Sequence, residues 1–181
     1  MHLSILLAVV LALQAANVLP HEPAPDLRHI INDGSVEILY SVEGQAVAVR
    51  GDGSVLKQST RQQLPLLPTC KGRVAQVDVR RLLETMLAAQ FLDLPQKSYV
   101  LLNEHWRTLQ MHSISIKATG GSAKWDFSAG EYGGKHQEIP QNFATIEKAI
   151  IDLESKAIPP GTHCRLGLPL WSEDKSVSTV R

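Results

Sequence analysis

The residues best suited to metal binding or acid–base chemistry in this 181-residue chain lie between positions 104 and 136. The seven histidines of the chain form no His-x-His or His-x3-His pair, so their spacing alone predicts no zinc site. A hairpin in this region could still bring His105, His112 and His136 together, with Glu104 or Glu131 supplying an oxygen ligand. One hypothesis is therefore a small exported hydrolase or metal-dependent enzyme; exposed loop histidines are the alternative interpretation.

Other catalytic patterns are incomplete in this sequence. Residues 130–136, GEYGGKH, come nearest to a phosphate-binding loop, but Ala129 stands where the leading glycine is needed. His136 replaces the hydroxyl residue that would bind Mg²⁺, and the chain has no Gly-x-Ser-x-Gly nucleophile elbow. We therefore predict no catalytic residues, no metal and no cofactor, and we prefer a protein that is not an enzyme.

The two cysteines, Cys70 and Cys164, are predicted to form a disulfide. An even number of cysteines is typical of exported proteins, whose compartment is oxidising. The bond would close a loop of about 94 residues, and two free thiols are the alternative.

Aromatic residues near irregular segments indicate a surface for a partner. The predicted interaction patch comprises Tyr99, Trp106, Trp125 and Tyr132. Aromatic side chains are frequent anchors of protein interfaces, although Trp106 and Trp125 could equally cap the core. The expected partner is a protein or a component of the cell envelope.

Charge excludes one class of partner. The chain has 18 basic and 18 acidic residues without a block of one sign, so it lacks the basic surface of a nucleic-acid binder.

The elements that would position these residues follow from periodicity. Alternating apolar and polar residues predict three strands near the start of the domain, and a later hairpin with a Gly-Gly turn predicts two more: residues 36–42, 45–50, 55–59, 109–118 and 123–128. Residues 63–72 are expected to be a loop, because they contain two prolines and a glycine. The apolar phase of the fourth strand changes near His112 and Ser113, which predicts a β-bulge there.

Two amphipathic helices complete the pattern. The first runs over residues 79–90, with Asp78 as its N-cap, and the second extends from Pro140 to Ala157. The order of elements is βββαββα, which predicts an α+β domain with an antiparallel sheet of about five strands and both helices on one face.

The N-terminus resembles a secretory signal peptide. Residues 3–13 contain one polar side chain, Ser4, and small or polar residues follow. The expected organisation is a signal peptide (1–16), an extended leader (17–35), one domain (36–164) and a flexible tail (165–181). A secreted or periplasmic protein is therefore expected; an uncleaved N-terminal membrane anchor is the alternative.

Several motifs together resemble a family of small, mostly bacterial secreted domains of unknown function. They are VEILY at residues 36–40, GDGS at 51–54, the helix that runs into FLDLP at 91–95, and the Gly-Gly turn before Trp125. The resemblance covers residues 36–157. It implies export and this order of elements, and it implies no activity, because the family has no assigned reaction or catalytic residues.

Overall fold

The computed structural model describes residues 34–59, 66–93, 108–132 and 135–170. The predicted signal peptide, most of the leader, and the predicted patch residues Tyr99 and Trp106 lie outside these ranges. His105 lies outside them as well.

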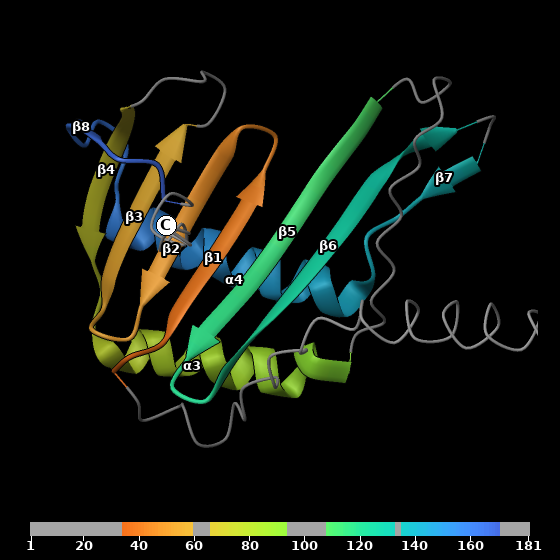
Figure 1. The fold of residues 1–181 in the computed structure, drawn as a ribbon, viewed down its shortest axis with the longest axis horizontal. Coiled ribbons are helices and arrows are strands. Elements are labelled where there is room, and N and C mark those ends of the chain that lie inside the picture. The colour runs from red at the N-terminus through yellow and green to blue at the C-terminus, as the bar shows by residue number, and fades with distance from the viewer. Residues whose placement is uncertain (1–33, 60–65, 94–107, 133–134, 171–181) are drawn as a thin grey trace, which may run out of the picture.

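One antiparallel sheet of eight strands forms the first layer of the domain (Figure 1). The strands are β1 (Glu37–Val42), β2 (Gln45–Arg50), β3 (Ser54–Ser59), β4 (Leu67–Arg73), β5 (Thr108–Ala118), β6 (Gly121–Tyr132), β7 (Lys135–Gln137) and β8 (Arg165–Gly167). Their order across the sheet is β7-β6-β5-β1-β2-β3-β4-β8, so β1 and β5 join the N-terminal and C-terminal hairpins.

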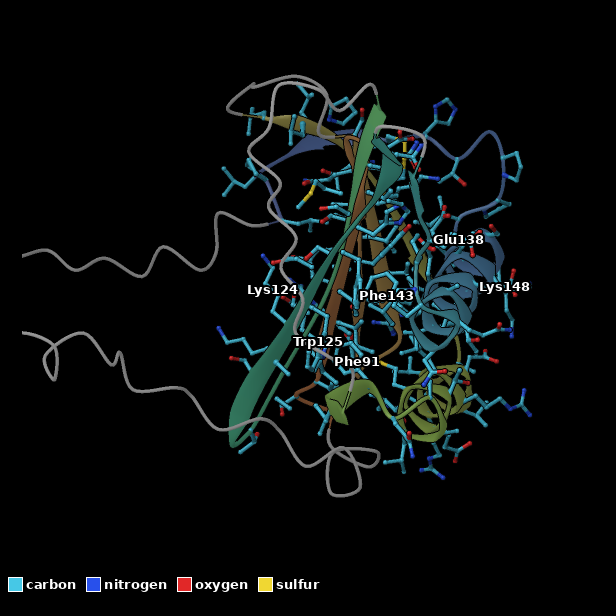
Figure 2. All side chains as sticks on the ribbon, turned by 90° about the vertical axis from the view of Figure 1, so that its right-hand side faces the viewer. Phe91, Lys124, Trp125, Glu138, Phe143 and Lys148 are labelled. Carbon is cyan, nitrogen blue, oxygen red and sulfur yellow. A yellow bond between two sulfur atoms is a disulfide. The ribbon has the colours of Figure 1, made fainter. Side chains whose placement is uncertain are left out.

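Two helices, α3 (Gln76–Ala88) and α4 (Gln141–Ala157), cover one face of this sheet, and a short 3₁₀ turn, η1 (Phe91–Asp93), follows α3 (Figure 1). Figure 2 shows Phe91, Trp125 and Phe143 between the sheet and the helices, while Lys124 points to the other side of the sheet. The alternation along the strands explains this arrangement, because every second residue faces the helices. The predicted α+β class with both helices on one face is confirmed.

The number and order of strands are corrections to the prediction. Residues 67–73 form β4, which overlaps the second half of the segment expected to be a loop, β7 follows the second hairpin, and β8 lies within the predicted tail. The folded part of the chain therefore continues past residue 164, to Leu170 at least.

The predicted bulge at His112 and Ser113 is wrong. The pairing of β5 with β6 keeps one register from Thr108–Glu131 to Ala118–Gly121. His112 lies on the same side of β5 as Ile114 and Ile116, facing the helices. Met111 is exposed on the other side. A bulge was predicted because a buried histidine and an exposed methionine invert the usual preference.

The helices differ less from expectation. α3 begins at Gln76, one turn earlier than predicted, so Asp78 lies in its first turn and Ala75 is the N-cap. α4 has the predicted bounds, with Pro140 at the N-cap, and it buries the predicted stripe of Phe143, Ile146 and Ile150. Among the described residues, no helix combines the length and the hydropathy needed to cross a membrane.

Candidate functional site

A buried polar cluster joins the sheet to α4. Tyr40 on β1 donates its hydroxyl hydrogen to Oε1 of Glu147, and Nδ1 of His112 on β5 lies 2.6 Å from the same oxygen. Tyr40 and His112 project from neighbouring strands towards the helices, because β1 and β5 pair with Tyr40 opposite Ile114 and Val42 opposite His112. Glu147 meets them from α4, one position after the buried Ile146.

The cluster favours an ionised Glu147 and a neutral Tyr40. Burial opposes ionisation of Glu147, but the hydrogen bonds from His112 and Tyr40 outweigh it and hold the pKa of Glu147 below its usual value. Burial, together with the hydrogen bond to Glu147 and the negative charges of Glu147 and Glu43, raises the pKa of Tyr40 well above its usual value. Nδ1 of His112 therefore carries a hydrogen and donates it to the carboxylate.

The other nitrogen of His112 has chemical capacity that the cluster does not use. His112 is buried, and its Nε2 has no hydrogen-bond partner among the described residues. A neutral imidazole whose Nδ1–H is held by a carboxylate presents a lone pair at Nε2, which can accept a proton, accept a hydrogen bond or bind a metal.

The backbone pairing separates Glu131 of the predicted metal site from His112, and His105 lies outside the described residues. His112 pairs with Phe127, whereas Glu131 pairs with Thr108, four residues along the ladder, which is about 13 Å at the usual strand rise. The backbone of His136, on β7, pairs with the backbone of Glu131, on β6. Within the described ranges, no group of three or more His, Cys, Asp or Glu residues could hold a metal ion.

Of the predicted aromatic patch, Trp125 belongs to the core and not to an exposed surface. Its side chain is 7 % exposed and packs edge-on against Phe91, with the ring centroids 5.8 Å apart. On β6 it stands on the same face as Phe127, so the alternation of the strand points it towards the helices. Tyr132 ends β6, and Tyr99 and Trp106 lie outside the described residues.

The two cysteines lie within bonding distance as predicted, and Cys70 and Cys164 form a disulfide with their Cα atoms 4.1 Å apart. The ladder of β4 with β8 pairs Thr69 with Arg165, so the disulfide continues its register by one position. The bond therefore joins two directly opposite residues at the end of a two-strand ladder.

An apolar surface lies on the same side of that ladder as the disulfide. Pro68 is exposed on β4, directly opposite Leu166 on β8, which is 68 % exposed. Leu66 precedes β4 and Leu168 follows β8, so continuing the register places them opposite each other, and Leu168 is 66 % exposed. We name Leu66, Pro68, Leu166 and Leu168 the β4–β8 apolar patch.

The backbone that carries this patch is held from the opposite side of the sheet by Gln58. The amide nitrogen of Gln58 donates to Thr69 Oγ1 at 2.7 Å and to the carbonyl oxygen of Leu168 at 2.6 Å. Its oxygen accepts the backbone N–H of Leu170 at 2.8 Å. Gln58 is buried, so one side chain fixes the segment after β8 by its backbone and leaves the Leu168 side chain exposed.

The β4–β8 apolar patch and the cluster around His112 differ in how well they could be predicted from the sequence. The β4–β8 apolar patch was missed because a three-residue strand has no measurable periodicity and because Pro68 favours a loop. Residues Cys70 and Cys164 did carry a signal, since a bond between them places the two segments side by side. The partner of His112, Glu147, follows Ile146 on the buried stripe of α4 and could have been found as a carboxylate at the margin of that stripe.

No family model, no curated protein and no solved structure matches this chain, so the family resemblance remains an expectation from the sequence.

Proposed function

We propose that this protein is an exported, non-enzymatic module that binds another protein or a component of the cell envelope through the β4–β8 apolar patch. The observation that carries the proposal is the grouping of Leu66, Pro68, Leu166 and Leu168 on one side of a ladder that a disulfide and Gln58 hold in place.

Two features support a binding role for this surface, and a third supports export. Contiguous exposed apolar side chains are costly in water and commonly mark an interaction site. The segment that presents them is restrained by covalent and hydrogen bonds, so little conformational entropy is lost when a partner binds. The signal-like N-terminus and the disulfide are consistent with a compartment outside the cytosol.

The test is capture of a partner from an envelope fraction with the purified, oxidised protein, followed by crosslinking. Leu166→Ser and Leu168→Ser should abolish capture of the species that the unaltered protein retains. The control is Val77→Ser on α3, which removes a 50 % exposed side chain away from the patch and should capture normally. Equal capture by the patch variants and the unaltered protein would refute this role.

A second candidate function, metal-dependent or acid–base catalysis, is favoured by one observation, the unpaired Nε2 of the buried His112 held in orientation by Glu147. Elemental analysis of the protein, purified without chelator, tests its metal form. Stoichiometric metal that is lost in His112→Ala would support this function over the binding role.

A further inference from the structure

We propose that the β8 edge of the sheet binds its partner by strand addition, and that the partner is an extended peptide segment in which acidic and apolar residues alternate. This inference rests on the proposed function and names the class of partner. Figure 1 shows β8 at the outer edge of the sheet beside β4, and β8 has no second neighbouring strand among the described residues.

Pro68 determines which backbone groups of β8 face outward. In an antiparallel ladder, opposite residues alternate between pairs that exchange two hydrogen bonds and pairs that exchange none. Pro68 has no N–H, so the pair Pro68–Leu166 is of the second kind. The N–H and C=O of Leu166 consequently point away from β4, where an additional strand can pair with both.

The side chains around Leu166 specify the residues of that strand. An added residue opposite Leu166 lies beside the β4–β8 apolar patch, so an apolar side chain is favoured there. The next residue of the added strand lies on the other side of the sheet, next to Arg165, which is exposed. An acidic side chain at that position would form a cross-strand ion pair.

Charge favours such a peptide over a second copy of this chain. The ladder carries Lys71, Arg73 and Arg165 and has no acidic residue in β4 or β8. Of these cations, Arg73 is paired with Asp52, whereas the described residues supply no acidic partner for Lys71 or Arg165. Two copies joined at this edge would bring together surfaces of the same sign, which opposes association.

The experiment uses the oxidised protein and a short synthetic peptide of alternating valine and glutamate, labelled for fluorescence anisotropy. Comparison peptides have lysine in place of glutamate, or N-methyl groups on the valines. We expect saturable binding of the valine–glutamate peptide only. Hydrogen exchange should slow at the Leu166 amide when this peptide binds, whereas the Gly167 amide, already paired with Leu67, serves as the internal control.

Two variants separate the backbone from the side chain at position 166. Leu166→Ala keeps the outward N–H, and Leu166→Pro removes it without touching the ladder with β4. We expect Leu166→Pro to bind the peptide about tenfold more weakly than Leu166→Ala. Arg165→Glu should weaken binding of the glutamate peptide, and it provides an independent test if Leu166→Pro does not fold.

The outcomes distinguish this inference from the function on which it rests. Suppose that Leu166→Ser loses envelope capture, while the unaltered protein neither binds the peptide nor shows protection of its Leu166 amide. That result would overturn strand addition and leave the binding role intact. Unchanged capture in Leu166→Ser would overturn the binding role. Sedimentation should show a monomer at micromolar concentration; a dimer that Leu166→Pro dissociates would identify a second copy as the occupant and overturn the peptide assignment.

Discussion

Nδ1 of His112 and Oε1 of Glu147 lie 2.6 Å apart and link strand β5 to helix α4 through the edge of the core. Glu147→Ala leaves the buried Tyr40 hydroxyl and His112 imidazole without their acceptor, so we expect a loss of about 2–3 kcal/mol in the free energy of unfolding. Urea denaturation followed by circular dichroism measures this loss. Glu147→Gln retains an acceptor oxygen and should cost less than Glu147→Ala; equal costs would contradict this explanation.

The same carboxylate makes stability depend on acid pH. The pKa of Glu147 is lower in the folded protein than its usual value of 4.5, so the unfolded chain takes up the proton first as the pH falls. The stabilisation by Glu147 is complete above pH 4.5 and is lost as the pH falls through the lower, folded-state pKa. Urea titrations of the unaltered protein and Glu147→Gln should converge in this window. A constant difference between them at every pH would exclude the linkage.

Removing one partner of the ion pair between β3 and α4 should cost more stability than replacing both partners. Nζ of Lys57 lies 3.0 Å from Oε1 of Glu154, whose side chain is almost completely buried. Lys57→Ala leaves that carboxylate buried without its partner, and we expect it to cost about 2–4 kcal/mol. The double variant Lys57→Met, Glu154→Leu replaces the pair by apolar groups and should recover most of that stability. Thermal unfolding ranks the variants, and a double variant as unstable as Lys57→Ala would contradict this expectation.

Gly72 is required by the contact between β4 and α4. A Cβ atom at this position would lie 2.1 Å from the backbone oxygen of Ala157, which cannot move without displacing the end of α4. We expect Gly72→Ala to destabilise the protein by about 3 kcal/mol. Gly34→Ala is the matched control, because nothing lies within 4 Å of a Cβ there. Similar midpoints of urea denaturation for the two variants would show that the strand can shift.

Removing the disulfide should lower stability substantially. Cys70 and Cys164 are 94 residues apart, and for a loop of this size chain entropy predicts up to about 4–5 kcal/mol. The variant with alanine at both positions should therefore have a lower urea midpoint, and hydrogen exchange should accelerate first at the amides of Arg165 and Gly167, which pair with β4. Equal urea midpoints for the unaltered protein and this variant would mean that the β4–β8 ladder and the hydrogen bonds of Gln58 hold β8 in place without the disulfide.

Helices and strands were predicted correctly where their apolar periodicity extends over several repeats. The alternation in β1 and the stripe of α4 each extend over several repeats, so both were predicted correctly. β4 was missed because its proline and glycine are read as breakers. In the fold, Pro68 lies one position beyond the last residue pair of β3 with β4, Gln58–Thr69, and Gly72 is needed for the approach of Ala157.

The polar clusters were predictable only in part. His112 was singled out as a functional residue, but its partner Glu147 lies 35 positions away, and no local pattern joins a strand to a helix. The register of β5 depends on burying His112 and exposing Met111, which becomes intelligible only when the carboxylate on α4 is known. Tertiary contacts, and not local preference, decide such positions.

The bond between Cys70 and Cys164 has a mechanical consequence. Antiparallel strands that are pulled apart at one end separate by breaking their hydrogen bonds one pair at a time, like a zipper. Here the covalent link lies at the end of β8 where the chain enters it from α4, directly opposite its partner on β4. When a bound partner pulls on β8, the disulfide therefore transmits the force to β4. The protein can bear load at this edge of the sheet without β8 detaching from β4.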